Sequence, residues 1–159
     1  MKSLRTGVAA GTMLLLCIPL ASTAAAPDPA PAYVPGLGEL MGANQMRHAK
    51  LWFAGEAGNW PLAAYELDEL REGFDDVLTF QPHFKGKPID KLLKPITEPA
   101  LAQLEAAIAA KDRTRFEAAF DELSRACSSC HRELGYGFVA IQRPTAPTFT
   151  NQRFAPSHP

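Results

Sequence analysis

Strand-like alternation, a stripe of positive charge and an apolar run long enough to cross a membrane are all missing from this sequence. Without alternating apolar and polar residues, no sheet is expected. The 16 lysines and arginines are scattered and are balanced by 17 acidic residues, so a nucleic acid partner is not expected. No acid–base pair or nucleophile array stands out in the chain, and we expect a protein that is not an enzyme.

Residues 1–24 have the pattern of a secretory signal peptide. A short basic start precedes the almost wholly apolar residues 8–20, and Ser22 and Ala24 supply the small side chains of a cleavage site. We therefore expect cleavage after Ala24, a periplasmic location and no stable membrane insertion of the mature protein. An uncleaved membrane anchor is the alternative. Cys17 follows Leu16 rather than a small residue, which does not favour a lipid anchor.

Four later stretches carry apolar residues at helical spacing and are bounded by helix-capping residues. They are predicted at residues 37–56, from the cap Asn59 to Val77, from the cap Thr97 to Ala110, and from the cap Asp112 to Leu134. The stretch 79–95 contains three prolines and is predicted as a loop, with a short turn of helix at 89–93. An antiparallel up-down-up-down four-helix bundle is the all-α fold that best accommodates these helices.

The predicted organisation has four parts. The signal peptide is followed by a proline-rich leader (25–36), the four-helix domain (37–138) and an extended C-terminal tail (139–159). In an up-down-up-down order, the start of the first helix lies beside the end of the fourth.

Removal of the signal peptide leaves two cysteines, three residues apart, in the sequence Cys127-Ser128-Ser129-Cys130-His131. This C-x-x-C-H pattern is typical of covalent haem attachment. Two thiols on one helical turn reach the two vinyl groups on one edge of a porphyrin, and the following histidine projects its imidazole toward the iron. The motif predicts one covalent haem c, held by Cys127 and Cys130, with His131 as proximal iron ligand.

Three other interpretations of the two cysteines are weaker. A thioredoxin-like dithiol needs a strand before its helix, whereas a helical pattern precedes this motif. A structural zinc site needs four ligands, and there is no second cysteine pair. A disulfide between residues three apart on a helix has poor geometry.

With its signal peptide, four helices and single late C-x-x-C-H, the chain resembles the cytochrome c-prime family and its low-spin relatives, which have methionine opposite histidine. The resemblance covers residues 37–138, and its specific part is the haem motif. It implies the bundle fold and a haem held near the end of the fourth helix. The chain extends 28 residues beyond His131, further than is usual in that family.

Residues of the first helix are candidates for the distal side of the haem. On a helical wheel, Met41, Asn44 and His48 share the inward stripe with the apolar residues, whereas Met46 lies on the opposite side. Met41 is a candidate sixth iron ligand, or it fills core space as methionine commonly does. Asn44 has the chemistry to donate a hydrogen bond to a bound diatomic ligand. His48, about 10 Å further along the helix, is expected to line the pocket, contact a haem propionate or be an ordinary buried histidine.

These residues predict electron transfer through a haem with His131 proximal and Met41 as candidate distal ligand, and redox proteins as partners. The alternative is a five-coordinate haem that binds nitric oxide or carbon monoxide in a pocket of Met41, Asn44 and His48. A peroxidase with His48 as distal base is less favoured, because His48 lies too deep. The sequence leaves open whether the protein forms a homodimer.

Overall fold

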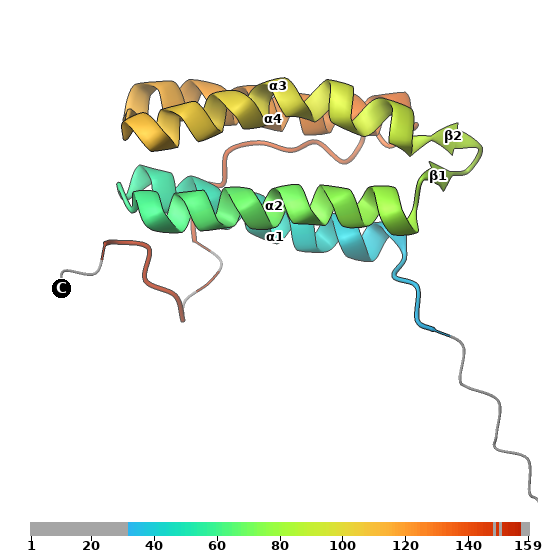
Figure 1. Cartoon of the computed structure of the whole chain (residues 1–159), viewed down its shortest axis with the longest axis horizontal. Coiled ribbons are helices and arrows are strands. Elements are labelled where there is room, and N and C mark those ends of the chain that lie inside the picture. Colours follow the sequence, from blue (N-terminus) through green and yellow to red (C-terminus); the bar gives the residue numbers. More distant parts are fainter. Residues whose placement is uncertain (1–31, 148, 150, 157–159) are drawn as a thin grey trace, which may run out of the picture. The chain divides into compact units, whose positions relative to one another are not determined.

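Four helices and one very short hairpin make up the described part of the chain (Figure 1). The computed structural model describes residues 32–147, 149 and 151–156. The elements in chain order are α1 (Leu37–Glu56), α2 (Trp60–Phe80), β1 (His83–Phe84), β2 (Lys87–Pro88), α3 (Ile89–Ala110) and α4 (Arg113–Glu133). The predicted all-α, four-helix fold is confirmed. The predicted signal peptide and residues 25–31 of the predicted leader lie outside the described residues.

Side-chain caps begin two of the helices at the predicted positions. The Asn59 side chain accepts a hydrogen bond from the backbone N–H of Leu62 (3.4 Å), and the Asp112 carboxylate accepts one from the N–H of Arg115 (3.0 Å). Each cap satisfies a backbone donor that has no partner inside its helix. Because so few residues connect α1 to α2 and α3 to α4, each pair folds into an antiparallel helical hairpin.

The predicted start of α3 at Thr97 is wrong, although the short turn of helix predicted at 89–93 is confirmed as the first part of α3. The helix begins at Ile89, eight residues earlier, and runs through Pro95 and Pro99. Both prolines are exposed, as is Lys91, so the carbonyl groups that lose their N–H partners face water. Thr97 is not a cap: it is buried, and its hydroxyl donates to the Leu93 carbonyl (2.8 Å). Burial of one apolar face therefore outweighs the local preference of proline for helix starts.

The loop that remains contains a two-stranded antiparallel hairpin, which the sequence did not predict. His83 pairs with Pro88 and Phe84 with Lys87. The turn places Lys85 and Gly86 in the left-handed region, with φ of 48° and 76°. Two-residue strands are too short to produce a visible alternation of apolar and polar residues.

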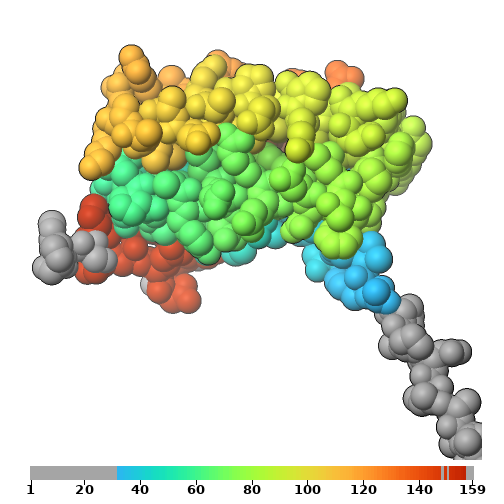
Figure 2. Space-filling view, in the orientation of Figure 1, coloured from blue at the N-terminus to red at the C-terminus, as the bar shows by residue number. Residues whose placement is uncertain are grey.

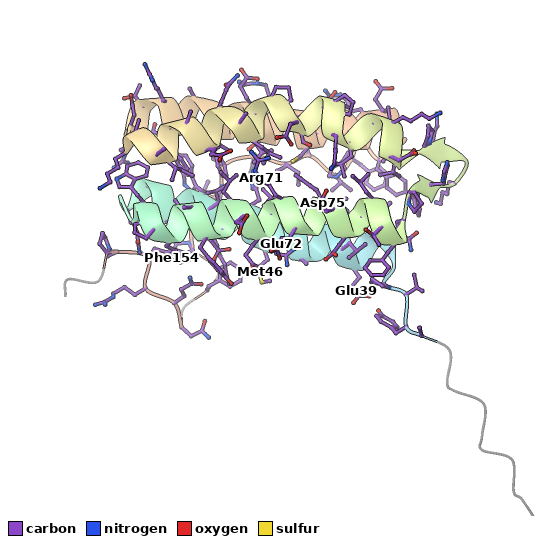
Figure 3. The ribbon with its side chains drawn as sticks, in the orientation of Figure 1. Glu39, Met46, Arg71, Glu72, Asp75 and Phe154 are labelled. Atoms are coloured by element: carbon purple, nitrogen blue, oxygen red, sulfur yellow. The ribbon has the colours of Figure 1, made fainter. Side chains whose placement is uncertain are left out.

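Two helical hairpins, α1–α2 and α3–α4, face each other in an up-down-up-down order (Figure 1). The side chains of α2 and α3 meet along the face seen in Figure 2. There Arg71 of α2 reaches toward α3 (Figure 3) and forms ion pairs with Glu98 (2.7 Å) and Glu105 (3.1 Å). These elements belong to one unit, Tyr33–Pro159, that is distinct from Met1–Ala32. No described helix has the length and apolar character needed to cross a membrane.

The chain after α4 turns back and follows the helices (Figure 1). Its Arg143 forms an ion pair with Asp121 of α4 (2.5 Å). Further on, the Phe154 ring packs against Phe53 of α1 (5.4 Å between centroids), and its carbonyl accepts a hydrogen bond from the Asn59 side chain (3.0 Å). The predicted tail thus contacts the bundle at both ends of its described length.

Gly55 provides a test of the packing between α1 and α4. It is buried, and a Cβ at this position would overlap the Phe116 ring. Alanine normally stabilises a helix by about 1 kcal/mol relative to glycine, but here we expect Gly55→Ala to lower the free energy of unfolding by about 1–3 kcal/mol through overpacking. Urea unfolding measures the change. A double-mutant cycle with Phe116→Leu is the control, because the smaller side chain should relieve part of the loss; purely additive effects would contradict the proposed overlap.

Candidate functional site

All three chemically distinctive residues of the C-x-x-C-H sequence line one cavity. Cys127, Cys130 and His131 occupy the last turns of α4, where the cavity has a volume of about 330 Å³, within the range of ligand pockets. Most of the lining is apolar, and it comes from all four helices, from β1 and from the chain beyond α4. The remaining lining residues are Leu37, Gly38, Met41, Gly42, Asn44, Gln45, His48, Leu70, Phe74, Phe84, Ile89, Leu93, Thr97, Leu134, Tyr136, Val139 and Ile141.

The imidazole of His131 is held in a defined orientation. Its Nδ1–H donates a hydrogen bond to the backbone carbonyl of Val139 (2.7 Å). A carbonyl can only accept, so the proton is on Nδ1, and in the neutral ring Nε2 keeps its lone pair. Metal-ligating histidines are typically oriented by such a bond from the other ring nitrogen. His131 is therefore prepared to bind a metal through Nε2.

Both cysteines are free thiols, and their environment keeps them protonated at neutral pH. Burial, with a smaller contribution from the adjacent Cys130, raises the pKa of the Cys127 thiol to about 12. Burial also raises the pKa of Cys130. A thioredoxin-like dithiol needs a lowered thiol pKa, so this environment does not suit one. Among the described residues, no three His, Cys, Asp or Glu side chains gather as a metal-binding group.

The wall contributed by α1 has room beside Met41. Gly38 and Gly42 both line the cavity, and a Cβ at either position would meet no atom within 4 Å. Met41 lies between these two glycines in the sequence, so the wall of the cavity near Met41 has two positions without a side chain. This leaves a flat group space to lie against α1. Met46, predicted to point away, is 42% exposed and lies on the outer side of the helix (Figure 3).

Asn44 carries the one described side-chain atom that is buried without a hydrogen-bond partner. Its Oδ1 accepts from Arg47 (3.2 Å), while its Nδ2 has no partner. Asn44 is 4% exposed, and it lines the cavity. Gly73 of α2 makes room for it, since a Cβ there would overlap Oδ1. An unpaired buried amide costs about 1–3 kcal/mol, so a hydrogen-bond acceptor that reached Asn44 Nδ2 would recover part of this cost.

His48 lines the inner end of the cavity and belongs to a short hydrogen-bond chain. The Ser124 hydroxyl donates to the Phe120 carbonyl (3.0 Å), so its oxygen is left to accept from His48 Nε2–H (3.0 Å). The His48 ring also packs on the Phe120 ring, at 4.3 Å between centroids. Burial lowers the pKa of His48 to about 4, so the imidazole is neutral near pH 7.

The structure thus brings every predicted site residue to one cavity: Cys127, Cys130, His131, Met41, Asn44 and His48. Several other lining residues were not predicted for the site, and among them four come from the predicted loop and the chain after α4. Val139 and Ile141 lie in the segment predicted as a tail, and Phe84 and Tyr136 pack against each other (5.9 Å between ring centroids). The clustering of apolar residues soon after the motif was the available signal.

Comparison with protein-family models, with curated proteins and with solved structures found no match. The case for a function therefore depends on the residues of this cavity.

We predict acid destabilisation through His48. Its pKa is about 4 in the folded protein, against an ordinary value of 6.5. Between these values the unfolded chain binds a proton at His48 that the folded protein does not. The free energy of unfolding should therefore fall by up to about 3 kcal/mol as the pH decreases from about 6.5 to about 4. Urea unfolding across this range measures the slope. His48→Gln removes the titrating group and should flatten the slope; parallel pH profiles for parent and variant would disprove this assignment.

Proposed function

We propose that this protein is an exported monohaem c-type cytochrome that transfers electrons. The observation that carries the proposal is the shared cavity: Cys127, Cys130 and His131 of α4 line it together with Met41 of α1. The signal-like residues 1–24 support a periplasmic location. Redox proteins of that compartment are the proposed partners.

The residues present fit a haem. Two protonated thiols, separated by one helical turn, are available to add to two vinyl groups. His131 has its Nδ1 proton held by Val139 and its Nε2 free to ligate iron. Gly38 and Gly42 leave space along α1, and Asn44, which also lines the cavity, has an Nδ2 without a hydrogen-bond partner.

In this function the chain contributes attachment, orientation and exclusion of water. Cys127 and Cys130 would hold the cofactor by thioether bonds, and His131 would ligate its iron. The apolar lining, with residues such as Leu70, Phe74 and Leu93, limits access of water. When bound, the haem iron supplies reversible one-electron exchange.

Met41 is the proposed distal ligand. It lies in the second turn of α1 and lines the same cavity as His131. His48 is engaged with Ser124 through Nε2 (3.0 Å), and Met46 lies outside. A methionine sulfur opposite histidine raises the reduction potential of a haem, which suits an electron carrier.

A second function, reversible binding of a diatomic gas, is favoured by Asn44. Asn44 lines the cavity that His131 also lines, and its buried Nδ2 has no hydrogen-bond partner. A five-coordinate haem would leave the distal position to such a ligand, with Asn44 as its hydrogen-bond donor. The absorption spectrum separates the two functions, because methionine ligation gives a low-spin spectrum and an open position gives a high-spin one.

Replacing both motif cysteines should abolish covalent haem attachment. Haem staining after denaturing electrophoresis should detect the parent protein and show no signal for Cys127→Ser/Cys130→Ser, because no thiol remains in the motif. Each single variant should stain weakly. Ser129→Ala, at a variable position of the motif, is the control and should stain like the parent. Full staining of the double variant would refute the proposed attachment.

Met41→Ala should change the distal side of the haem. If Met41 is the sixth ligand, the low-spin spectrum of the parent should become high-spin in the variant. If the parent is already high-spin, carbon monoxide should bind faster to Met41→Ala, because a bulky side chain has been removed from the pocket. Met46→Ala, on the exposed side of the same helix, should match the parent in both measurements. Met41 is the wrong residue if Met41→Ala also matches the parent while His48→Ala does not.

A further inference from the structure

The partner of His131 comes from the chain beyond the haem motif. The Val139 carbonyl, eight residues after His131, accepts the Nδ1–H hydrogen bond at 2.7 Å. Val139 is 39% exposed, so water has access to this region. If Val139 belonged to a mobile tail, water would replace its carbonyl as the acceptor for His131 Nδ1–H. The hydrogen bond therefore requires that this segment is held in place.

Ser128 holds this segment from within the motif. Its Oγ accepts a hydrogen bond from the Ile141 N–H (2.9 Å) and donates one to the Ile141 carbonyl (3.2 Å). Ile141 lies two residues after Val139, and both line the cavity. The hydroxyl of Ser128, the second residue of C-x-x-C-H, thus holds in place the segment whose Val139 carbonyl accepts the hydrogen bond from His131.

Arg143 attaches the same segment to an earlier part of α4. Its guanidinium makes two hydrogen bonds with the Asp121 carboxylate (2.5 and 2.8 Å) and one with the Glu117 carbonyl (3.2 Å). It also stacks on the Trp52 ring of α1, at 4.6 Å from the ring centroid. Such a bidentate pair is geometrically specific as well as strong. We refer to residues 138–143 as the strap.

A turn before the strap limits its freedom at the other end. The Val139 N–H donates to the Tyr136 carbonyl (2.8 Å), and the Tyr136 hydroxyl accepts from Lys85 of the β-hairpin turn (2.6 Å). Val139 is thereby fixed between a turn attached to the hairpin and the contacts of Ser128 and Arg143.

We propose that the strap is a positioning element for His131: it orients the imidazole and increases the basicity of Nε2 through the bond to Val139. The inference rests on the proposed haem site and goes beyond it, because it assigns a role to the chain after the bundle. A hydrogen bond from Nδ1–H makes a histidine a stronger donor to iron. The stronger donor favours the ferric state, so the strap should lower the reduction potential.

The experiment loosens the strap without changing a haem-binding residue. Ser128→Ala removes both bonds to Ile141, and Arg143→Gln removes the ion pair with Asp121. The matched controls are Ser128→Thr, which retains the hydroxyl, and Ser129→Ala. Ser129 has no side-chain hydrogen bond to another described residue. All are tested as purified full-chain holoproteins, and a thermal melt followed by circular dichroism identifies any variant that has not folded.

Two readouts report on His131 itself. Solvent exchange of the Nδ1 proton, followed by NMR, should be about tenfold faster in Ser128→Ala and in Arg143→Gln, as expected for the loss of one or two hydrogen bonds that hold the acceptor. The reduction potential of both variants should be higher than that of the parent. Ser128→Thr and Ser129→Ala should match the parent in both readouts.

The outcomes distinguish this inference from the proposed function. A parent protein without covalent haem overturns the proposed function and the strap's role with it. If the parent carries haem but folded Ser128→Ala and Arg143→Gln match it in proton exchange and in potential, the strap does not position His131 and the inference alone fails. If Ser129→Ala changes both readouts as much as Ser128→Ala does, the effect belongs to the motif in general and the strap is again rejected.

Discussion

The contact of two phenylalanines of α4 with α1 determines where the cavity lies. Phe116 and Phe120 are fully buried, and both pack against the Trp52 ring at 6.2 and 5.0 Å between centroids. Gly55 leaves room for the Phe116 ring. This aromatic cluster fills the space between α1 and α4 at one end of the bundle. His48 is the boundary: its ring packs on Phe120 and also lines the cavity. From His48 toward the start of α1, no aromatic residue follows, and this part of α1 lines the cavity together with the other three helices.

Helix periodicity and caps were sufficient to predict most of this arrangement. Asn59 and Asp112 are strong capping residues followed by apolar residues at helical spacing, and both helices begin where expected. Thr97 misled the prediction because Thr-Glu-Pro resembles a helix start. Its hydroxyl instead bonds to a carbonyl inside the helix, and only the packing of the neighbouring apolar face decides between these two roles. The local sequence pattern predicts that a helix exists, whereas the residue at which the helix starts depends on contacts that are distant in sequence.

The candidate site also has one part that local sequence pattern predicts and another that depends on contacts distant in sequence. The motif residues could be predicted from their spacing. Met41, Asn44 and His48 could be predicted from the inward stripe of α1 together with the antiparallel order of the helices. The strap could not be predicted. Val139 contributes a backbone carbonyl, which every residue possesses, and Ser128 occupies a variable position of the motif where any side chain is permitted. Arg143 reads as an exposed base near a proline until its partners Asp121 and Trp52 are known. Such hydrogen-bond acceptors and anchoring residues are defined by their positions in the fold, so their residue types alone do not identify them.

The unpaired amide of Asn44 bears on both candidate functions, electron transfer and the binding of a diatomic ligand. Its Nδ2 is buried without a partner, and leaving it so costs about 1–3 kcal/mol. Asn44 follows Met41 by three residues, so the two side chains lie on neighbouring positions of one helix face. With Met41 as iron ligand, the only acceptor that it brings near Asn44 is a thioether sulfur, which is weak and recovers a small part of that cost. A diatomic ligand brings a stronger acceptor and recovers more of it. The unpaired amide of Asn44 therefore favours ligand binding, while the placement of Met41 between two glycines favours electron transfer. The balance depends on the strength of the Met41–iron bond relative to the hydrogen bond that Asn44 would offer to an exogenous ligand.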